Sequence, residues 1–210
     1  MIRPRRPNDE AQRPVSFHNN SLIEGATRGE HLSALHDLGR VLEREIQSFE
    51  AASIDPLTGL ANRSGLMALG EEMLSISRSA DEGAAVLFVD LAGARPINDR
   101  FGHAAGDRAL RDLARILEAT FRASDLVARV GDDQFCVVMA PYADASEGFV
   151  VTSRVQRAVD AYNDSAGVPW TLGVNIGGVR CTPGMRLERL VALADARMAE
   201  ARSLRRASRH

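Results

Sequence analysis

The sequence predicts an α/β (α+β) sandwich, in which helices cover an open β-sheet. Long segments with apolar residues at helical spacing alternate with short apolar runs that have the length of buried strands. Two of these runs, residues 125–130 and 135–140, flank a short polar stretch, as the two strands of a β-hairpin do. With 210 residues, of which 45% are hydrophobic, the chain is long enough to bury one sizeable core.

The N-terminal part is predicted to contain a tail and one helix. Residues 1–27 are rich in Pro, Arg and Asn without periodicity, which is typical of a flexible tail. Residues 28–53 carry apolar side chains at helical spacing, and Leu35, Leu42 and Phe49 repeat every seven residues. This stripe predicts either a short coiled coil, which would make the chain a weak homodimer, or a helix packed on its own domain.

The remaining elements alternate, and each is predicted from the period of its apolar residues. No internal repeat interrupts their order, so we expect one domain. Helices are expected at residues 62–79, 104–122, 145–163 and 187–205, and strands at 85–91, in the hairpin and at 170–179, with a loop and a short helical turn after the first strand.

Composition excludes several classes of protein. The formal net charge is −2 and the pI is about 6.2, which gives no basic surface for nucleic acid or an anionic membrane. Cys136 and Cys181 lack the spacing of metal ligands. The longest apolar stretch, at residues 84–91, is too short to span a bilayer, and no secretory signal is evident. We therefore expect a cytoplasmic protein that binds neither membrane nor nucleic acid.

Three polar segments stand out at the ends of the predicted elements. Residues 55–63, DPLTGLANR, form a turn rich in helix-capping residues. Asp90 ends an apolar strand, which is where open α/β sheets place ligands, although a lone Asp there is also typical of a solvated strand end. Residues 129–135, RVGDDQF, contain the hairpin turn and include Asp133. Magnesium takes one or two protein carboxylates together with phosphate oxygens, which makes Asp90 and Asp133 candidate ligands.

These segments resemble the motifs of the GGDEF (diguanylate cyclase) family, whose members join two GTP molecules into cyclic di-GMP. Residues 55–63 match the family string D-x-L-T-G-L-x-N-R, and residues 90–107 are similar to D-x-D-x-F-K-x-I-N-D-x-x-G-H-x-x-G-D. Residues 131–135, GDDQF, stand in place of GGDEF, and residues 194–206 resemble the family's last helix. The resemblance covers residues 54–206. It implies a nucleotidyl-cyclase-like domain with a central, mostly antiparallel sheet flanked by helices and preceded by an N-terminal signalling helix.

The resemblance implies a role for each residue that matches a family position. Magnesium binding is implied for Asp90, for Leu91 through its backbone carbonyl, and for Asp133. GTP binding is implied for Asn98 and Asp107, whose amide and carboxylate suit the edge of guanine, and for His103, Arg95, Arg202 and Arg206. The catalytic turn is implied to be Gly131, Asp132, Asp133 and Gln134. A His at a helix start and basic residues near a helix end are also explained by helix structure alone.

The signature turn departs from the family pattern at two positions. Asp132 replaces the second Gly, and two like charges about 4 Å apart repel by about 4 kcal/mol at an effective dielectric of ~20. Gln134 replaces the Glu, and a neutral amide cannot act as a general base. In the preceding motif, Ala92 stands for a second Asp, Ala94 for a Phe and Arg95 for a Lys. We therefore predict a degenerate GGDEF domain with little or no cyclase activity.

A predicted product-binding site lies upstream of the turn. Arg122 and Asp125 stand at the spacing of the family's R-x-x-D inhibitory site, which binds cyclic di-GMP. An Arg fork can bond guanine O6 and N7 or a phosphate, and an Asp accepts guanine N–H groups. Arg154, on the following predicted helix, is expected to support the site from the same side. The pattern is also a common accident at helix ends.

Three functions stay open for this set of residues. The first is a cyclic di-GMP receptor that signals through its N-terminal helix or an unknown protein partner. The second is a GTP-binding regulator that uses Asp90, Asn98, Asp107 and Asp133 without cyclising. The third is a residual cyclase that works as a dimer, with magnesium and one GTP in each half-site.

Overall fold

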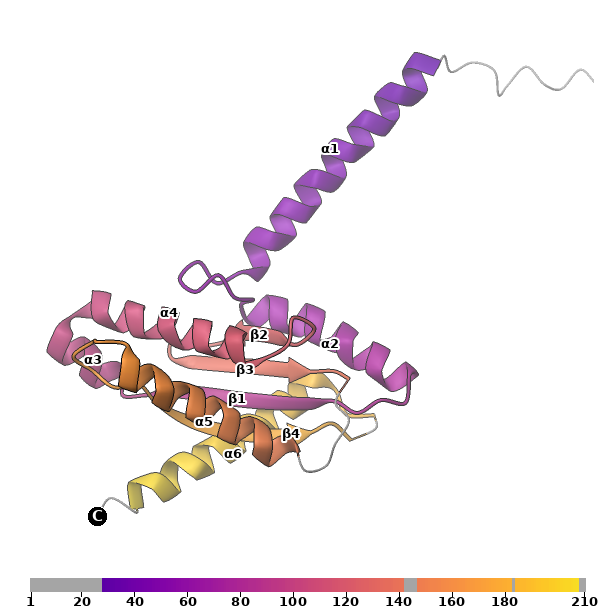
Figure 1. Cartoon of the computed structure of the whole chain (residues 1–210). Coiled ribbons are helices and arrows are strands. Elements are labelled where there is room, and N and C mark those ends of the chain that lie inside the picture. The colour runs from indigo at the N-terminus through magenta and orange to yellow at the C-terminus, as the bar shows by residue number, and fades with distance from the viewer. Residues whose placement is uncertain (1–27, 142–146, 183, 208–210) are drawn as a thin grey trace, which may run out of the picture. The chain divides into compact units, whose positions relative to one another are not determined.

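The computed structural model describes residues 28–141, 147–182 and 184–207, so the predicted tail at 1–27 lies outside the described residues. Its alternating elements confirm the predicted α+β sandwich (Figure 1). The helices are α1 (Arg28–Ser53), α2 (Arg63–Ser79), α3 (Ala94–Phe101), α4 (His103–Thr120), α5 (Glu147–Ser165) and α6 (Leu187–Ala207). The strands are β1 (Ala85–Ala92), β2 (Leu126–Arg129), β3 (Gln134–Met139) and β4 (Gly173–Arg180).

The four strands form one sheet in the order β2-β3-β1-β4. All three strand pairs are antiparallel, which confirms the predicted antiparallel sheet. β1 lies between β3 and β4, and its residues are buried as far as Leu91. Because Asp90 pairs with Gln134, the polar turn of the hairpin lies next to the end of β1.

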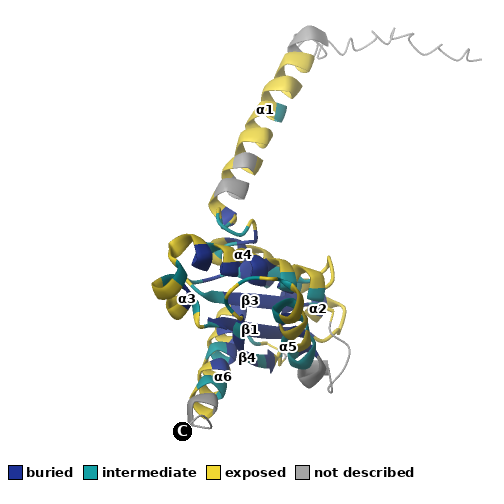
Figure 2. Ribbon diagram, turned by 60° about the vertical axis from the view of Figure 1, so that its left-hand side comes forward, coloured by how far each residue is buried: buried dark blue, intermediate teal, exposed yellow. Residues whose placement is uncertain are grey.

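Side chains of β1 alternate between the two faces of the sheet, and each face has its own core. Leu87, Val89 and Leu91 pack with residues of α4 and α5, whereas Val86 and Phe88 pack with residues of α2 and α6. Figure 2 shows the buried centre at β1 and β3 in dark blue, with exposed residues on the helices. By the same alternation, the next even-numbered residue of β1 belongs to the face covered by α6.

Helix α6 lies directly against β4. Gly177 makes this contact possible, because a Cβ atom there would come within 2.2 Å of the backbone nitrogen of Met198. Ala194 and Met198 are buried against the sheet, and Arg202 follows four residues later on the same side of the helix. The close approach therefore carries Arg202 to the polar end of β1.

Some element ends differ from the sequence prediction. The expected short helical turn after β1 is α3, a full helix that begins after Gly93 in the left-handed conformation. α4 ends at Thr120, so Arg122 follows the helix instead of ending it. Asp125 lies in a bend rather than in the hairpin strand, because its carboxylate accepts the backbone N–H of Arg122 and closes a turn.

The turn before α2 is tied to the hairpin by one arginine. Asp55 accepts hydrogen bonds from the N–H and hydroxyl groups of Thr58, and Asn62 caps the first turn of α2. Arg129 donates to both carboxylate oxygens of Asp55 and, at 2.7 Å, to the backbone carbonyl of Asp132. Burial alone raises the pKa of Asp55, but the bonds from Thr58 and then Arg129 hold that pKa below its usual value.

Helix α1 carries the seven-residue stripe. Leu35 and Leu42 are 65% and 54% exposed, and the side chain of Phe49 lies outside the described part. Pairing of two copies through this helix stays a prediction. Within the described ranges, every helix is too short or too polar to cross a membrane.

Candidate functional site

A row of three polar residues crosses the sheet near the end of β1. Asp90 pairs in register with Gln134 of β3 on one side and with Asn175 of β4 on the other. Directly paired residues of neighbouring strands point to the same face, so these side chains share the face covered by α6. Asn175 Nδ2 donates to Asp90 Oδ2 at 2.8 Å. The sheet itself therefore holds the Asp90 carboxylate in place.

Arg202 supplies a cation to this row. Its Nη1 atom lies 3.6 Å from Oδ1 of Asp90, whose side chain is only 2% exposed. That oxygen is buried and has no hydrogen-bond partner among the described residues. The side chain of Arg202 is 43% exposed, so part of it remains open to a ligand. A buried carboxylate with incomplete hydrogen bonding thus meets a partly accessible guanidinium.

The hairpin turn brings a second carboxylate towards Asp90. The backbone N–H of Leu91 donates to the carbonyl of Asp133 at 2.8 Å and holds the turn beside β1. Burial raises the pKa of Asp133 above its usual value, and the Asp90 carboxylate raises it further. Among the described residues, no three metal-binding side chains gather. Magnesium usually takes one or two carboxylates plus phosphate oxygens. Asp90 and Asp133 supply two carboxylates here, but Asp90 already faces the Arg202 guanidinium.

The two altered signature residues differ in their surroundings. Asp132 is exposed, whereas Gln134 is half-buried. The Oε1 atom of Gln134 lies 2.7 Å from the place that a Cβ atom at Gly131 would occupy. Gly131 therefore leaves room for the Gln134 amide, which has no carboxylate chemistry to offer a metal ion or a proton.

The residues implied in guanine recognition come from α3 and α4. The Oδ1 atom of Asn98 is buried without a partner in the described part of the chain. It lies 1.8 Å from the position of a Cβ atom at Gly106, so any larger residue there would displace the Asn98 amide. Asp107 is half-buried, whereas His103 and Arg95 are exposed. An unsatisfied amide oxygen is an acceptor that a ligand N–H group can use.

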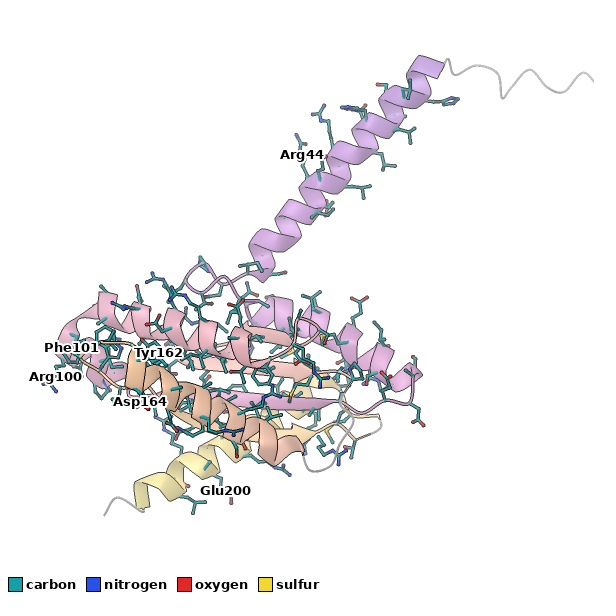
Figure 3. The ribbon with its side chains drawn as sticks, viewed as in Figure 1. Arg44, Arg100, Phe101, Tyr162, Asp164 and Glu200 are labelled. Carbon is teal, nitrogen blue, oxygen red and sulfur yellow. The ribbon has the colours of Figure 1, made fainter. Side chains whose placement is uncertain are left out.

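A cavity of about 770 Å³ opens beside the polar row, towards the loop between α5 and β4. Figure 3 labels Arg100 and Phe101 of α3 and Tyr162 and Asp164 of α5, at the same end of the sheet. Asn98 and Asp107 are not among the lining residues, and the side chain of Arg206 lies outside the described part. The lining that matters here consists of Ala92, Gly93, Arg100, Trp170, Asn175 and Arg202.

The predicted product-binding residues meet at the corner between α4 and β2. Asp125 Oδ2 accepts the backbone N–H of Arg122 at 2.9 Å, and the Arg122 side chain is exposed. Arg154 of α5 donates to the carbonyl of Thr120, and its guanidinium carbon lies 5.9 Å from the ring centroid of Phe121. The structure brings the three residues to one corner, and their binding role stays a prediction.

Sequence reasoning missed two residues that shape the site. Asn175 is a polar residue inside a buried strand, and this unusual position was the sequence feature that could have marked it as a site residue. Arg129 opens the RVGDDQF segment, but its bond to Asp55 depends on a contact between distant parts of the chain.

The fold and the site together define an α+β domain with carboxylate, amide and guanidinium side chains at one end of an antiparallel sheet. The profile of the family described as "Diguanylate cyclase, GGDEF domain" matches residues 52–208. The chain belongs to the GGDEF family.

The relatives give the same assignment. The chain is 32% identical to diguanylate cyclase TpbB of Pseudomonas aeruginosa over 163 residues, which cover 74% of this chain and 38% of TpbB. It is similar to the solved structure of diguanylate cyclase SiaD with its activator SiaC, also from Pseudomonas aeruginosa (TM-score 0.66, 26% identity, 83% of this chain and 70% of that one). A structure described as a novel interaction mode between a microbial GGDEF domain and cyclic di-GMP has a TM-score of 0.61, 29% identity and coverage of 72% and 93%. The chain thus spans less than half of the length of TpbB.

Proposed function

We propose that this chain is a cyclic di-GMP receptor that does not synthesise the nucleotide, with Arg122, Asp125 and Arg154 as its binding site. The observation that carries the proposal is the open corner between α4 and β2. Asp125 is positioned by the main chain, so the exposed Arg122 side chain is not consumed in pairing with it. Arg154 is anchored on the carbonyl of Thr120 beside them. An exposed Arg and a positioned Asp suit the acceptor and donor edges of guanine.

The comparisons support a nucleotide ligand and a protein partner. One related GGDEF domain is described with cyclic di-GMP, and SiaD is described with an activator protein. Occupancy of the corner would pass to a partner protein or through α1, whose stripe of Leu35, Leu42 and Phe49 would pair two copies.

Calorimetric titration with cyclic di-GMP tests the proposal. Arg122→Ala is expected to weaken binding by about 10²-fold or more, because charge-assisted hydrogen bonds are lost. Arg111→Ala removes an equal charge from an exposed position on α4 and should leave the affinity unchanged. Equal affinities of wild type and Arg122→Ala would show that cyclic di-GMP does not bind at the corner between α4 and β2.

A second candidate is a GTP-binding regulator that does not cyclise. The observation in its favour is the buried Oδ1 atom of Asn98, an acceptor with no described partner, next to the half-buried Asp107. GTP should therefore bind more tightly than ATP, whose base lacks the matching N1–H and N2–H donors. Asn98→Ala should reduce this preference, and equal binding of the two nucleotides would count against the candidate.

A further inference from the structure

We propose that Arg202 takes the place of a divalent cation at Asp90, so that the phosphates of a guanine nucleotide bind beside it without magnesium. This inference rests on the second candidate function, GTP binding without cyclisation. It concerns the phosphate end of that site and is independent of the corner at Arg122.

The first support is the geometry of the Asp90–Arg202 pair. Asp90 is buried, and its Oδ2 atom is already bonded to Asn175. Its other oxygen faces the Arg202 guanidinium at 3.6 Å. The pair is not incidental, because Gly177 lets α6 lie against β4 and Met198 sets the helix face that carries Arg202. The fold thus presents a cation to the carboxylate that a metal ion would otherwise neutralise.

The second support is the chemistry of an arginine in this position. A guanidinium has five N–H donors in a planar fork, so it can face a carboxylate on one edge and a phosphate on another. The side chain of Arg202 is 43% exposed, which leaves part of the fork accessible. A lysine ammonium is a compact point charge and serves two such partners less well.

The third support is the cavity on which the pair opens. Its described lining includes Arg100 and Arg202 but no Asp or Glu. Ala92 stands in this lining, where a second carboxylate would favour a metal ion. A volume of about 770 Å³ is in the range of ligand sites, so phosphates can enter a cavity whose lining includes two arginines. A divalent ion, in contrast, must first displace the guanidinium from Asp90.

Fluorescence of Trp170 provides the test, because it is the only tryptophan of the chain and lines the cavity. The full chain is titrated with GTP, once in EDTA and once with magnesium. We expect the two dissociation constants to agree within about threefold. Binding that is at least about tenfold tighter with magnesium would overturn the inference and leave the GTP-binding function intact. Absence of binding in both buffers would overturn the GTP-binding function itself.

Two variants, one of which should weaken binding while the other should not, separate the role of Arg202 from simple misfolding. Arg202→Gln is expected to weaken binding in EDTA by about tenfold or more, while Arg189→Gln, an exposed change on the same helix, should have no effect. Asp90→Asn releases Arg202 and should keep or tighten binding in EDTA. Loss of binding in EDTA for Asp90→Asn, with folding confirmed by circular dichroism, would overturn the inference.

Metal affinity without nucleotide completes the test. Manganese binding is measured by electron paramagnetic resonance on the free protein, since the spectrum of the free ion disappears when it binds. Arg202→Gln should bind manganese more tightly than wild type, because Asp90 has lost its internal cation. Equal or weaker manganese binding by the variant would contradict the inference.

Discussion

Two of the arginine–carboxylate sites in the domain differ in how far their charges and hydrogen bonds are already satisfied within the protein. At the end of β1, Asp90 is buried, bonded to Asn175 and paired with Arg202. At the corner between α4 and β2, Arg122 is exposed, and Asp125 is bonded to the main chain. We call the first the closed site, because its carboxylate already has a cation and only part of the Arg202 side chain stays accessible, and the second the open site.

The difference teaches where ligand binding can contribute most. A carboxylate that already has an internal cation gains little from a metal ion, whereas an exposed guanidinium gains new charge-assisted bonds from a phosphate or guanine. The changes from the family pattern also fall on the closed site, at Asp132 and Gln134. The comparison therefore favours binding over synthesis.

The largest expected effect concerns synthesis at the closed site. Wild type should give no cyclic di-GMP from GTP and magnesium, because loss of one acid–base group commonly costs about 10²–10⁴ in rate. The double change Asp132→Gly with Gln134→Glu should exceed wild type when product is measured by chromatography. Product from wild type that disappears in Asp90→Ala would show that the closed site still works.

Two substitutions of Asp125 test how this residue contributes to cyclic di-GMP binding at the open site. Asp125→Asn keeps an acceptor for the Arg122 N–H group but loses the charge, whereas Asp125→Ala loses both. We expect cyclic di-GMP affinity to fall about tenfold for Asp125→Asn and further for Asp125→Ala, as titration would measure. Asp99→Ala, an exposed acid on α3, is the control and should bind normally. Unchanged cyclic di-GMP binding by Asp125→Ala would mean that the open site is not the binding site, and the contrast with the closed site would fail.

The closed site depends on the close packing of α6 against β4. The free energy of unfolding of variants at the contact tests this dependence. Gly177→Ala places a Cβ atom 2.2 Å from the backbone of α6, so the helix must move. We expect a loss of about 1–3 kcal/mol in the free energy of unfolding by urea. Gly173→Ala is the control on the same strand, because its Cβ atom would meet only Ala92, at ordinary distance. Equal stability of the two variants would mean that α6 does not rest on Gly177.

A second copy of the chain would present both sites twice. We predict a weak homodimer through α1, because burying a large apolar side chain contributes about 1.5–3 kcal/mol and the stripe holds Leu35, Leu42 and Phe49. Sedimentation should show a concentration-dependent dimer that is absent in a chain beginning at Ala52 and in Leu35→Asp. A dimer that survives both changes, or a monomer at high concentration, would assign the stripe to packing within one chain.

The smallest expected effect is the pH dependence at Asp133. Its folded pKa lies above the ordinary value, chiefly through burial, so the ionised form is disfavoured in the fold. The resulting loss of stability is complete above the folded pKa and vanishes as the pH falls through it towards 3.8. Asp133→Asn should therefore raise the thermal midpoint slightly at pH 7, because the amide has no charge to desolvate.

The same measurement at pH 4 gives the control within one variant. The gain from Asp133→Asn should shrink there, and the exposed change Asp164→Asn on α5 should give little at either pH. A gain that does not depend on pH would point to packing rather than charge.

Most of the fold could be predicted from the sequence because each core element buries a periodic set of apolar residues. α3 was underestimated because Ile97 is its only fully buried residue, so no period marks it as a helix. The bend at Asp125 was missed because a side-chain bond to the main chain, rather than apolar pattern, ends the segment.

The sequence predicted most residues of the site but not the contacts between them. Asp90 and Arg202 were both named from motifs, yet their contact depends on the pairing of β1 with β4 and on Gly177 beneath α6. Asn175 joins the row only through that register. Such contacts join residues that are far apart in the chain, and local spacing does not encode them.

The bond network of Arg129 has a consequence for how such domains change over evolutionary time. The hairpin turn is held by backbone bonds and by Arg129, which reaches Asp55 and the carbonyl of Asp132. None of these bonds uses the side chain of residue 132 or 134. Mutations at those two positions can therefore accumulate by drift while the turn is inherited intact. A lineage can lose catalysis in one or two substitutions and still pass on a folded domain that is available for a new task.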